Sequence, residues 1–164
     1  MLAEFKNLTP DEQQTMFDAI PLITILVAAA DNELDEVELR EAQRLADIRS
    51  FNVRGRLTAY YEQIDQGLSQ RIMDIYNNLP AGLEQREEIL WQRLRPLNDI
   101  LRKLPKPYDY LYYHSFHTFA KHVAEAHGGF LRFITVGPKE ARVMTLPMID
   151  RMEKPDEPEY HNLF

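Results

Sequence analysis

The sequence contains no cysteine, which excludes disulfide bonds, thiolate zinc sites and cysteine nucleophiles. It also lacks a long hydrophobic run. The longest, AIPLITILVAAA at residues 19–30, is too short for a transmembrane helix, which needs about 20 apolar residues. The N-terminal sequence MLAEFKNLTPDE has no basic start followed by an apolar stretch. We therefore expect no signal peptide, no transmembrane segment and a cytoplasmic location.

Common catalytic motifs are missing as well. The sequence has no glycine-rich phosphate loop, no G-x-S-x-G elbow and no H-E-x-x-H metal motif. These absences lower the expectation of catalysis, and we predict a protein that is not an enzyme and that has no tightly bound cofactor.

The net charge of −7 is concentrated at the two ends of the chain. Residues 1–50 carry 11 acids against 4 bases, residues 51–150 carry 11 against 13, and residues 151–164 carry 4 against 2. The acidic first third would repel a phosphate backbone, so we expect no nucleic-acid binding. A local basic stretch is interpreted as solvated surface; it contains Arg44, Arg49, Arg54 and Arg56.

Helix signals dominate a chain whose 164 residues and 45% hydrophobic content fit one globular domain. Thr9-Pro10-Asp11-Glu12 is typical of a capped helix start. Pro21 is expected to kink or break that helix near Ile20, and a second short helix should follow from about Leu22 to Ala30. Further helices are predicted over residues 35–48, 56–78 with Gly67 as a weak point, 82–103 with a kink at Pro96, 107–126 and 138–152.

The predicted fold is therefore all-α, a compact bundle of about six to eight helices formed by residues 1–152. Residues 131–136, LRFITV, have the composition of a strand but nothing to pair with, so we expect an extended connection there. Residues 153–164 are polar and proline-broken, and we expect a disordered acidic tail.

Two segments of the sequence are similar to each other. VAAAD at residues 27–31 and VAEAH at residues 123–127 each close an apolar stretch. Each is followed by a turn-prone residue, an aliphatic residue, a capping position and a glutamate three residues later. The pattern predicts a duplicated helix–loop–helix unit and a pseudo-two-fold bundle.

The first copy, ADNELDEVE at residues 30–38, resembles the A-D-G-x-I-x-x-x-E signature of tellurite-resistance TerB-like domains. The similarity runs from about Met16 to Ile149. It implies an all-helical cytoplasmic module with a role in stress or metal-anion resistance, which interacts or responds to ions rather than catalyses. Asn32 replaces the family's glycine, and asparagine tolerates the same left-handed turn. His127 replaces the second aspartate, which argues against equivalent carboxylates in both halves.

The acidic stretch has three compatible interpretations. Asn32 can end one helix and Asp35 can cap the next, with Glu38 reaching back to the cap. The same residues can form a docking surface for a basic protein partner. They can also form a weak, hydrated Ca²⁺ or Mg²⁺ site, although Glu36 and Ala42 stand where a calcium loop needs glycine and glutamate. The candidate residues are Asp31, Glu33, Asp35 and Glu38.

Four histidines between Tyr112 and Gly128 suggest an alternative, a metal-dependent hydrolase or metalloenzyme built on His114 and His117 with nearby carboxylates. Helical spacing argues against it, because it places His114 nearly opposite Phe116 in an apolar stripe and leaves too few convergent ligands. The stripe contains Tyr112, Phe116, Phe119, Ala120 and Val123, and the other histidines are His122 and His127.

A third hypothesis is that the protein is a structural subunit of a larger assembly, which includes the case of a homo-oligomer.

Overall fold

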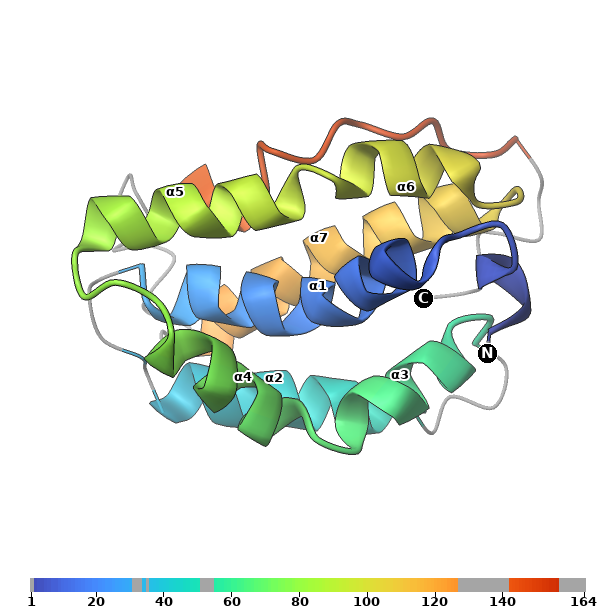
Figure 1. The fold of residues 1–164 in the computed structure, drawn as a ribbon. Coiled ribbons are helices and arrows are strands. Elements are labelled where there is room, and N and C mark those ends of the chain that lie inside the picture. The colour runs from blue at the N-terminus through green and yellow to red at the C-terminus, as the bar shows by residue number, and fades with distance from the viewer. Residues whose placement is uncertain (1, 31–33, 35, 51–54, 127–141, 157–164) are drawn as a thin grey trace.

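The computed structural model describes residues 2–30, 34, 36–50, 55–126 and 142–156 (Figure 1). Within these residues it contains α-helices and one short 3₁₀ helix, η1, and no strand, so the all-α class is confirmed. None of the described helices is long and apolar enough to cross a membrane. The elements are η1 (Ala3–Phe5), α1 (Pro10–Ala28), α2 (Glu36–Ser50), α3 (Thr58–Asp65), α4 (Leu68–Asn77), α5 (Leu83–Leu94), α6 (Leu97–Lys103) and α7 (Tyr108–Ala126).

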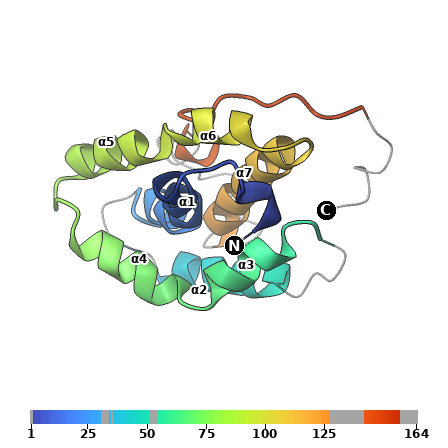
Figure 2. The same cartoon turned by 45° about the vertical axis from the view of Figure 1, so that its right-hand side comes forward.

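The helices form three layers around α1 (Figures 1 and 2). α5 and α6 lie on one side, α1 and α7 form the middle, and α2, α3 and α4 lie on the other side. α1 begins as predicted: Thr9 N–H donates to the Glu12 carboxylate at 2.9 Å, and Glu12 N–H donates to Thr9 Oγ1 at 3.3 Å. From Ala19 onward every residue of α1 is buried, because neighbours cover it on all sides.

α1 continues through Pro21 to Ala28, so the predicted break near Ile20 is wrong. Proline cannot donate to the carbonyl four residues earlier, and in a helix interior this costs about 3 kcal/mol. The residues after Pro21 are all buried, and each large aliphatic side chain gains about 1.5–3 kcal/mol from burial. Several such side chains outweigh one missing hydrogen bond, which explains why the helix persists.

The other predicted interruptions are confirmed. Gly67 separates α3 from α4, and Pro96 separates α5 from α6. In α2 the side chain of Val37 is 43% exposed. The buried stripe begins instead at Glu38 and continues through Ala42 and Leu45 at helical spacing.

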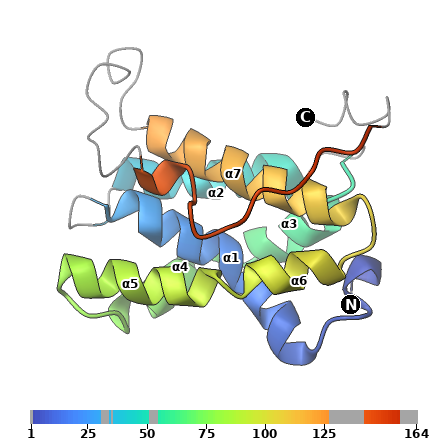
Figure 3. The same cartoon turned by 90° about the horizontal axis from the view of Figure 1, so that it is seen from above.

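The predicted helix over residues 138–152 is wrong beyond Met144. Residues 142–144 are helical, but Leu146 has a φ of 45° and the chain then leaves the helix. Pro147 explains the change, because the residue before a proline disfavours the helical conformation. Residues 146–156 pass over α6 and α7 (Figure 3), and we call this segment the C-terminal strap.

Asn98 of α6 holds the C-terminal strap. Its Nδ2 donates to the Met148 carbonyl at 2.9 Å, and its Oδ1 accepts from the Asp150 N–H at 2.7 Å. Arg102 adds an ion pair to Asp150 at 2.6 Å. The strap also buries four apolar side chains, those of Leu146, Met148, Ile149 and Met152. Residues 146–152 are therefore part of the core. The predicted tail begins at residue 153, and its residues 157–164 lie outside the described residues.

Candidate functional site

The predicted acidic site is described only in part. Asp31, Glu33 and Asp35 lie outside the described residues. Glu38 lies in the first turn of α2 and is 5% exposed, so its carboxylate faces the interior instead of water. Among the residues that the structure describes, no group of three or more histidines and carboxylates could hold a metal ion. A cation site that uses the four carboxylates stays a prediction.

The apolar stripe predicted for α7 is confirmed, because all five of its residues are buried. His114 and His117 lie beside this stripe and are half-buried. The rings of Tyr113 and His117 are 4.4 Å apart. His122 is exposed near the end of α7, and His127 lies outside the described residues.

Burial, together with a smaller contribution from the neighbouring His114, lowers the pKa of His117 to about 4. Burial also lowers the pKa of His114, followed by the positive charges of Arg49 and Lys154. Both imidazoles are therefore neutral at neutral pH. The Nε2 atom of His117 is buried and has no hydrogen-bond partner within the described part of the chain. These features favour a packing role for the two rings.

A cavity that the sequence analysis did not predict lies between the end of α2, the start of α3 and one face of α7. Its volume is about 240 Å³. It is lined by basic, hydroxyl-bearing and apolar side chains, and none of its described lining residues is acidic, although the chain has 26 acids. The basic residues are Arg49, Arg56 and His122, the hydroxyl-bearing residues are Thr58, Tyr61, Ser115 and Thr118, and the apolar residues are Leu57 and Leu111.

Arg49 is the half-buried cation of this cavity. Its Nη1 donates to Tyr61 Oη at 2.7 Å, to Ser115 Oγ at 2.8 Å and to the Ser115 carbonyl at 3.0 Å. Its Nη2 donates to Thr118 Oγ1 at 3.2 Å. The guanidinium carbon also lies 5.2 Å from the ring centre of Tyr61 and 5.4 Å from that of Phe119. All of these partners are neutral.

These bonds leave the Nε–H of the Arg49 guanidinium without a protein acceptor among the described residues. A guanidinium carries N–H donors on all three nitrogens, and the Nε–H is not used by any described side chain or carbonyl. The Nε–H and one Nη2–H of arginine lie side by side, and such a pair matches the two oxygens of a carboxylate. The hydroxyl partners fix the plane of the guanidinium, so this edge is held in one orientation.

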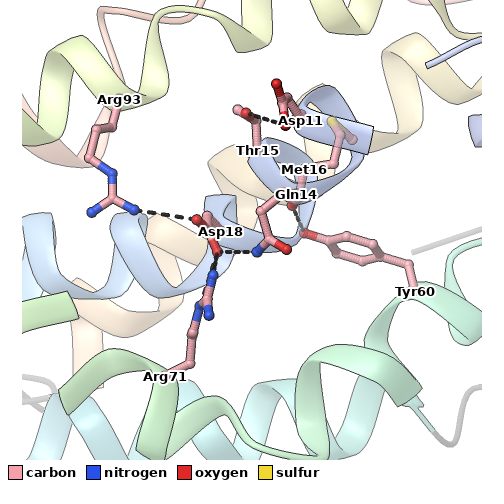
Figure 4. A network of polar contacts seen from close by, with 8 residues as sticks. All are labelled: Asp11, Gln14, Thr15, Met16, Asp18, Tyr60, Arg71 and Arg93. Carbon is pink, nitrogen blue, oxygen red and sulfur yellow. Dashed lines mark hydrogen bonds and ion pairs between the residues drawn. The ribbon is translucent and has the colours of Figure 1, made fainter. Parts of the chain in front are cut away.

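Asp18 shows the opposite arrangement (Figure 4). Its carboxylate lies near the middle of α1, and the residue is 8% exposed. One oxygen accepts from Arg71 at 2.6 and 3.1 Å and from Gln14 at 2.9 Å, and the other accepts from Arg93 at 3.3 Å. Arg71 comes from α4 and Arg93 from α5, so Asp18 ties the outer layers to the central helix. Both oxygens are occupied by protein donors, which indicates a structural role.

The sequence showed Arg49 only as a member of a basic stretch that we interpreted as solvated. The structure places its guanidinium against Ser115 and Thr118, which are 66 and 69 residues away in the chain. A pattern of neighbouring residues in the sequence does not predict a contact between residues so far apart.

Comparison with known proteins gives no match: no protein-family model, no curated protein and no solved structure is significantly similar to this chain.

Proposed function

We propose that this chain is a non-enzymatic binding module and that the cavity beside Arg49 binds an anionic ligand. The observation that carries this proposal is a half-buried guanidinium that lines a cavity of about 240 Å³ and is met only by neutral acceptors. A charge removed from water without an opposite charge is unfavourable. An anion in the cavity would supply that charge, and its oxygens would accept from the remaining N–H edge.

The arginines that form ion pairs within the described chain support the assignment by contrast. Arg71 and Arg93 share Asp18, Arg44 pairs with Glu41 at 2.5 Å, and Arg102 pairs with Asp150. Arg49 differs from them because no described carboxylate contacts it. Arg49 is half-buried, contacts no carboxylate of the described chain and lies at a cavity.

The test is an NMR titration of the protein with small anions, following the Arg49 Nε–H and the amides of Ser115 and Thr118. We expect shifts in the wild type that Arg49→Gln abolishes and Arg49→Lys retains in weaker form. Arg40→Gln is the matched control, because Arg40 lies on the same helix, is 77% exposed at its side chain and does not line the cavity. If no anion shifts these resonances at millimolar concentration, the proposal is refuted.

The TerB-like resemblance is part of the same proposal, including the role in stress or tellurite resistance and the cytoplasmic location. Two features support a duplicated, pseudo-two-fold arrangement. α1 and α7 are both 19 residues long and end at the two copies of the repeated sequence. They also lie side by side and run in the same direction (Figures 1 and 3). An experimental structure in which residues 27–38 and 123–140 have unlike geometries would refute the duplication.

A second candidate function uses the acidic residues between α1 and α2, as a docking surface for a basic partner or a weak Ca²⁺ or Mg²⁺ site. α1 ends at Ala28 and α2 begins at Glu36, so Asp31, Glu33 and Asp35 fall in the connection. Because Glu38 is buried, we restrict this surface to those three carboxylates.

We expect Asp31→Ala with Glu33→Ala to leave the melting temperature nearly unchanged and to abolish a calcium-dependent shift or a partner contact. An absence of amide shifts in residues 31–38 at millimolar calcium would refute the cation site and leave the docking surface to be tested by pull-down.

A further inference from the structure

From the shape of the same cavity we infer that its ligand is an organic monocarboxylate with an apolar body about the size of a benzene ring. This inference rests on the proposed function, because it requires that an anion binds at Arg49. It adds the chemical class of the ligand, which follows from the volume of the cavity, its charge and the order of residues along α7.

The volume exceeds what the anionic group alone needs. An apolar cavity of about 150 Å³ accepts benzene, so a cavity of about 240 Å³ has room for a ring of that size and a carboxylate. Acetate or an inorganic oxyanion would occupy only the part near Arg49. The lining includes the apolar side chains of Leu57 and Leu111, and an apolar group gains free energy by replacing water beside them.

The charge of the cavity matches a single negative charge. Arg49 is half-buried, whereas the other two basic residues of the lining, Arg56 and His122, are exposed at the surface. A monocarboxylate neutralises Arg49 and fits its Nε–H and Nη2–H edge with two oxygens. Arg49 is the only half-buried cation among the described lining residues, and the first negative charge would already pair with it. A dianion such as a phosphate monoester would place a second negative charge in this half-buried region.

The order of residues along α7 places the two parts of the ligand. Leu111, Ser115, Thr118 and His122 recur at the spacing of one helix face, and all four line the cavity. Ser115 and Thr118 hold Arg49, and Leu111 lies one turn before Ser115, about 6 Å along the helix axis. A carboxylate at Arg49 therefore directs an attached ring of similar length toward Leu111, which is 2% exposed.

Isothermal titration of the full chain with benzoate, acetate, sulfate, phenyl phosphate and toluene tests the inference. We expect benzoate to bind at least about tenfold more tightly than acetate or sulfate, since a buried apolar group of this size is worth that factor or more. Phenyl phosphate should bind more weakly than benzoate, and toluene should not bind measurably. Arg49→Gln should abolish benzoate binding.

Variants of the apolar wall separate this inference from the proposed function. Leu57→Ala should weaken benzoate about tenfold and leave acetate unchanged. Leu57 is half-buried, so this variant is expected to fold, and Leu111→Ala is a second variant to be used if its melting temperature is retained. If acetate, sulfate and benzoate bind with equal affinity, or if Leu57→Ala has no effect on benzoate, the inference of an apolar monocarboxylate ligand is overturned. The proposal that the cavity binds an anion would still stand. Tighter binding of phenyl phosphate or toluene than of benzoate also overturns the inference, and no binding of any anion refutes both.

Discussion

Replacing Asp18 with asparagine tests the central electrostatic contact of the fold. The substitution keeps the shape of the side chain but removes its charge and turns one acceptor oxygen into a donor. That donor would face Arg71 or Arg93, so at least one of the observed bonds is lost and the rest weaken. A hydrogen bond to a charged group contributes about 1.5–3 kcal/mol.

The expected loss in the free energy of unfolding is smaller than for a fully buried ion pair. The side chains of Arg71 and Arg93 are 46% and 39% exposed, so both regain water when the carboxylate is removed. The carboxylate side chain itself is only 12% exposed. We therefore expect Asp18→Asn to lower the free energy of unfolding by about 2 kcal/mol. For a chain of this length that corresponds to a fall in melting temperature of about 4–8 °C.

The assay is urea denaturation followed by circular dichroism, together with a thermal melt. Glu62→Gln is the matched control, because Glu62 is an exposed acid on α3, and we expect its effect to stay within about 0.5 kcal/mol. Arg71→Gln should lower the free energy of unfolding more than Arg93→Gln does. The reason is that Arg71 donates two hydrogen bonds to Asp18, at 2.6 and 3.1 Å, whereas Arg93 donates one at 3.3 Å. A loss for Asp18→Asn no larger than that of the control would show that solvent replaces the contact completely.

Two further predictions follow from buried polar groups. Because burial lowers the pKa of His117 to about 4 from an ordinary value of 6.5, the unfolded chain binds a proton at higher pH than the folded chain does. Stability should therefore fall as pH drops from 6.5 toward 4, and His117→Phe should flatten this part of the denaturation profile, whereas an unchanged profile would contradict the assignment. Asn98→Leu should remove both hydrogen bonds to the C-terminal strap and accelerate hydrogen exchange in residues 146–152. Exchange in α1 should not change, and Asn98→Asp, which keeps the acceptor for the Asp150 N–H, should have the smaller effect.

Local chemistry made part of the fold predictable. The capping box at Thr9 is complete within four residues, and Gly67 and Pro96 disrupt a helix through their own backbone properties. Pro21 has the same intrinsic preference as Pro96, yet α1 continues through it because the following residues are buried on all sides. Sequence shows the cost of a proline but not how much burial the surrounding helices provide.

The candidate site shows the same limit. Acidic and histidine-rich stretches are conspicuous because their members are close in sequence, but Glu38 is buried and the neighbouring His114 and His117 rings pack beside the core. Arg49 acquires its surroundings from α3 and α7, through Tyr61 and Ser115. Its charge was visible in the sequence, but its partners depend on how distant helices pack.

Asp18 and Arg49 are accommodated by the protein in different ways, and the difference separates stability from binding. Asp18 accepts from protein donors on both oxygens, so it stabilises the fold. Arg49 is oriented by hydroxyls and a carbonyl but has no acidic partner in the described chain, so it keeps an edge that an anion can use. Asp18→Asn should therefore lower the melting temperature without changing benzoate affinity, whereas Arg49→Gln should abolish that affinity with a smaller change in melting temperature. Equal loss of affinity in both variants would mean that the cavity depends on the whole fold rather than on its own cation.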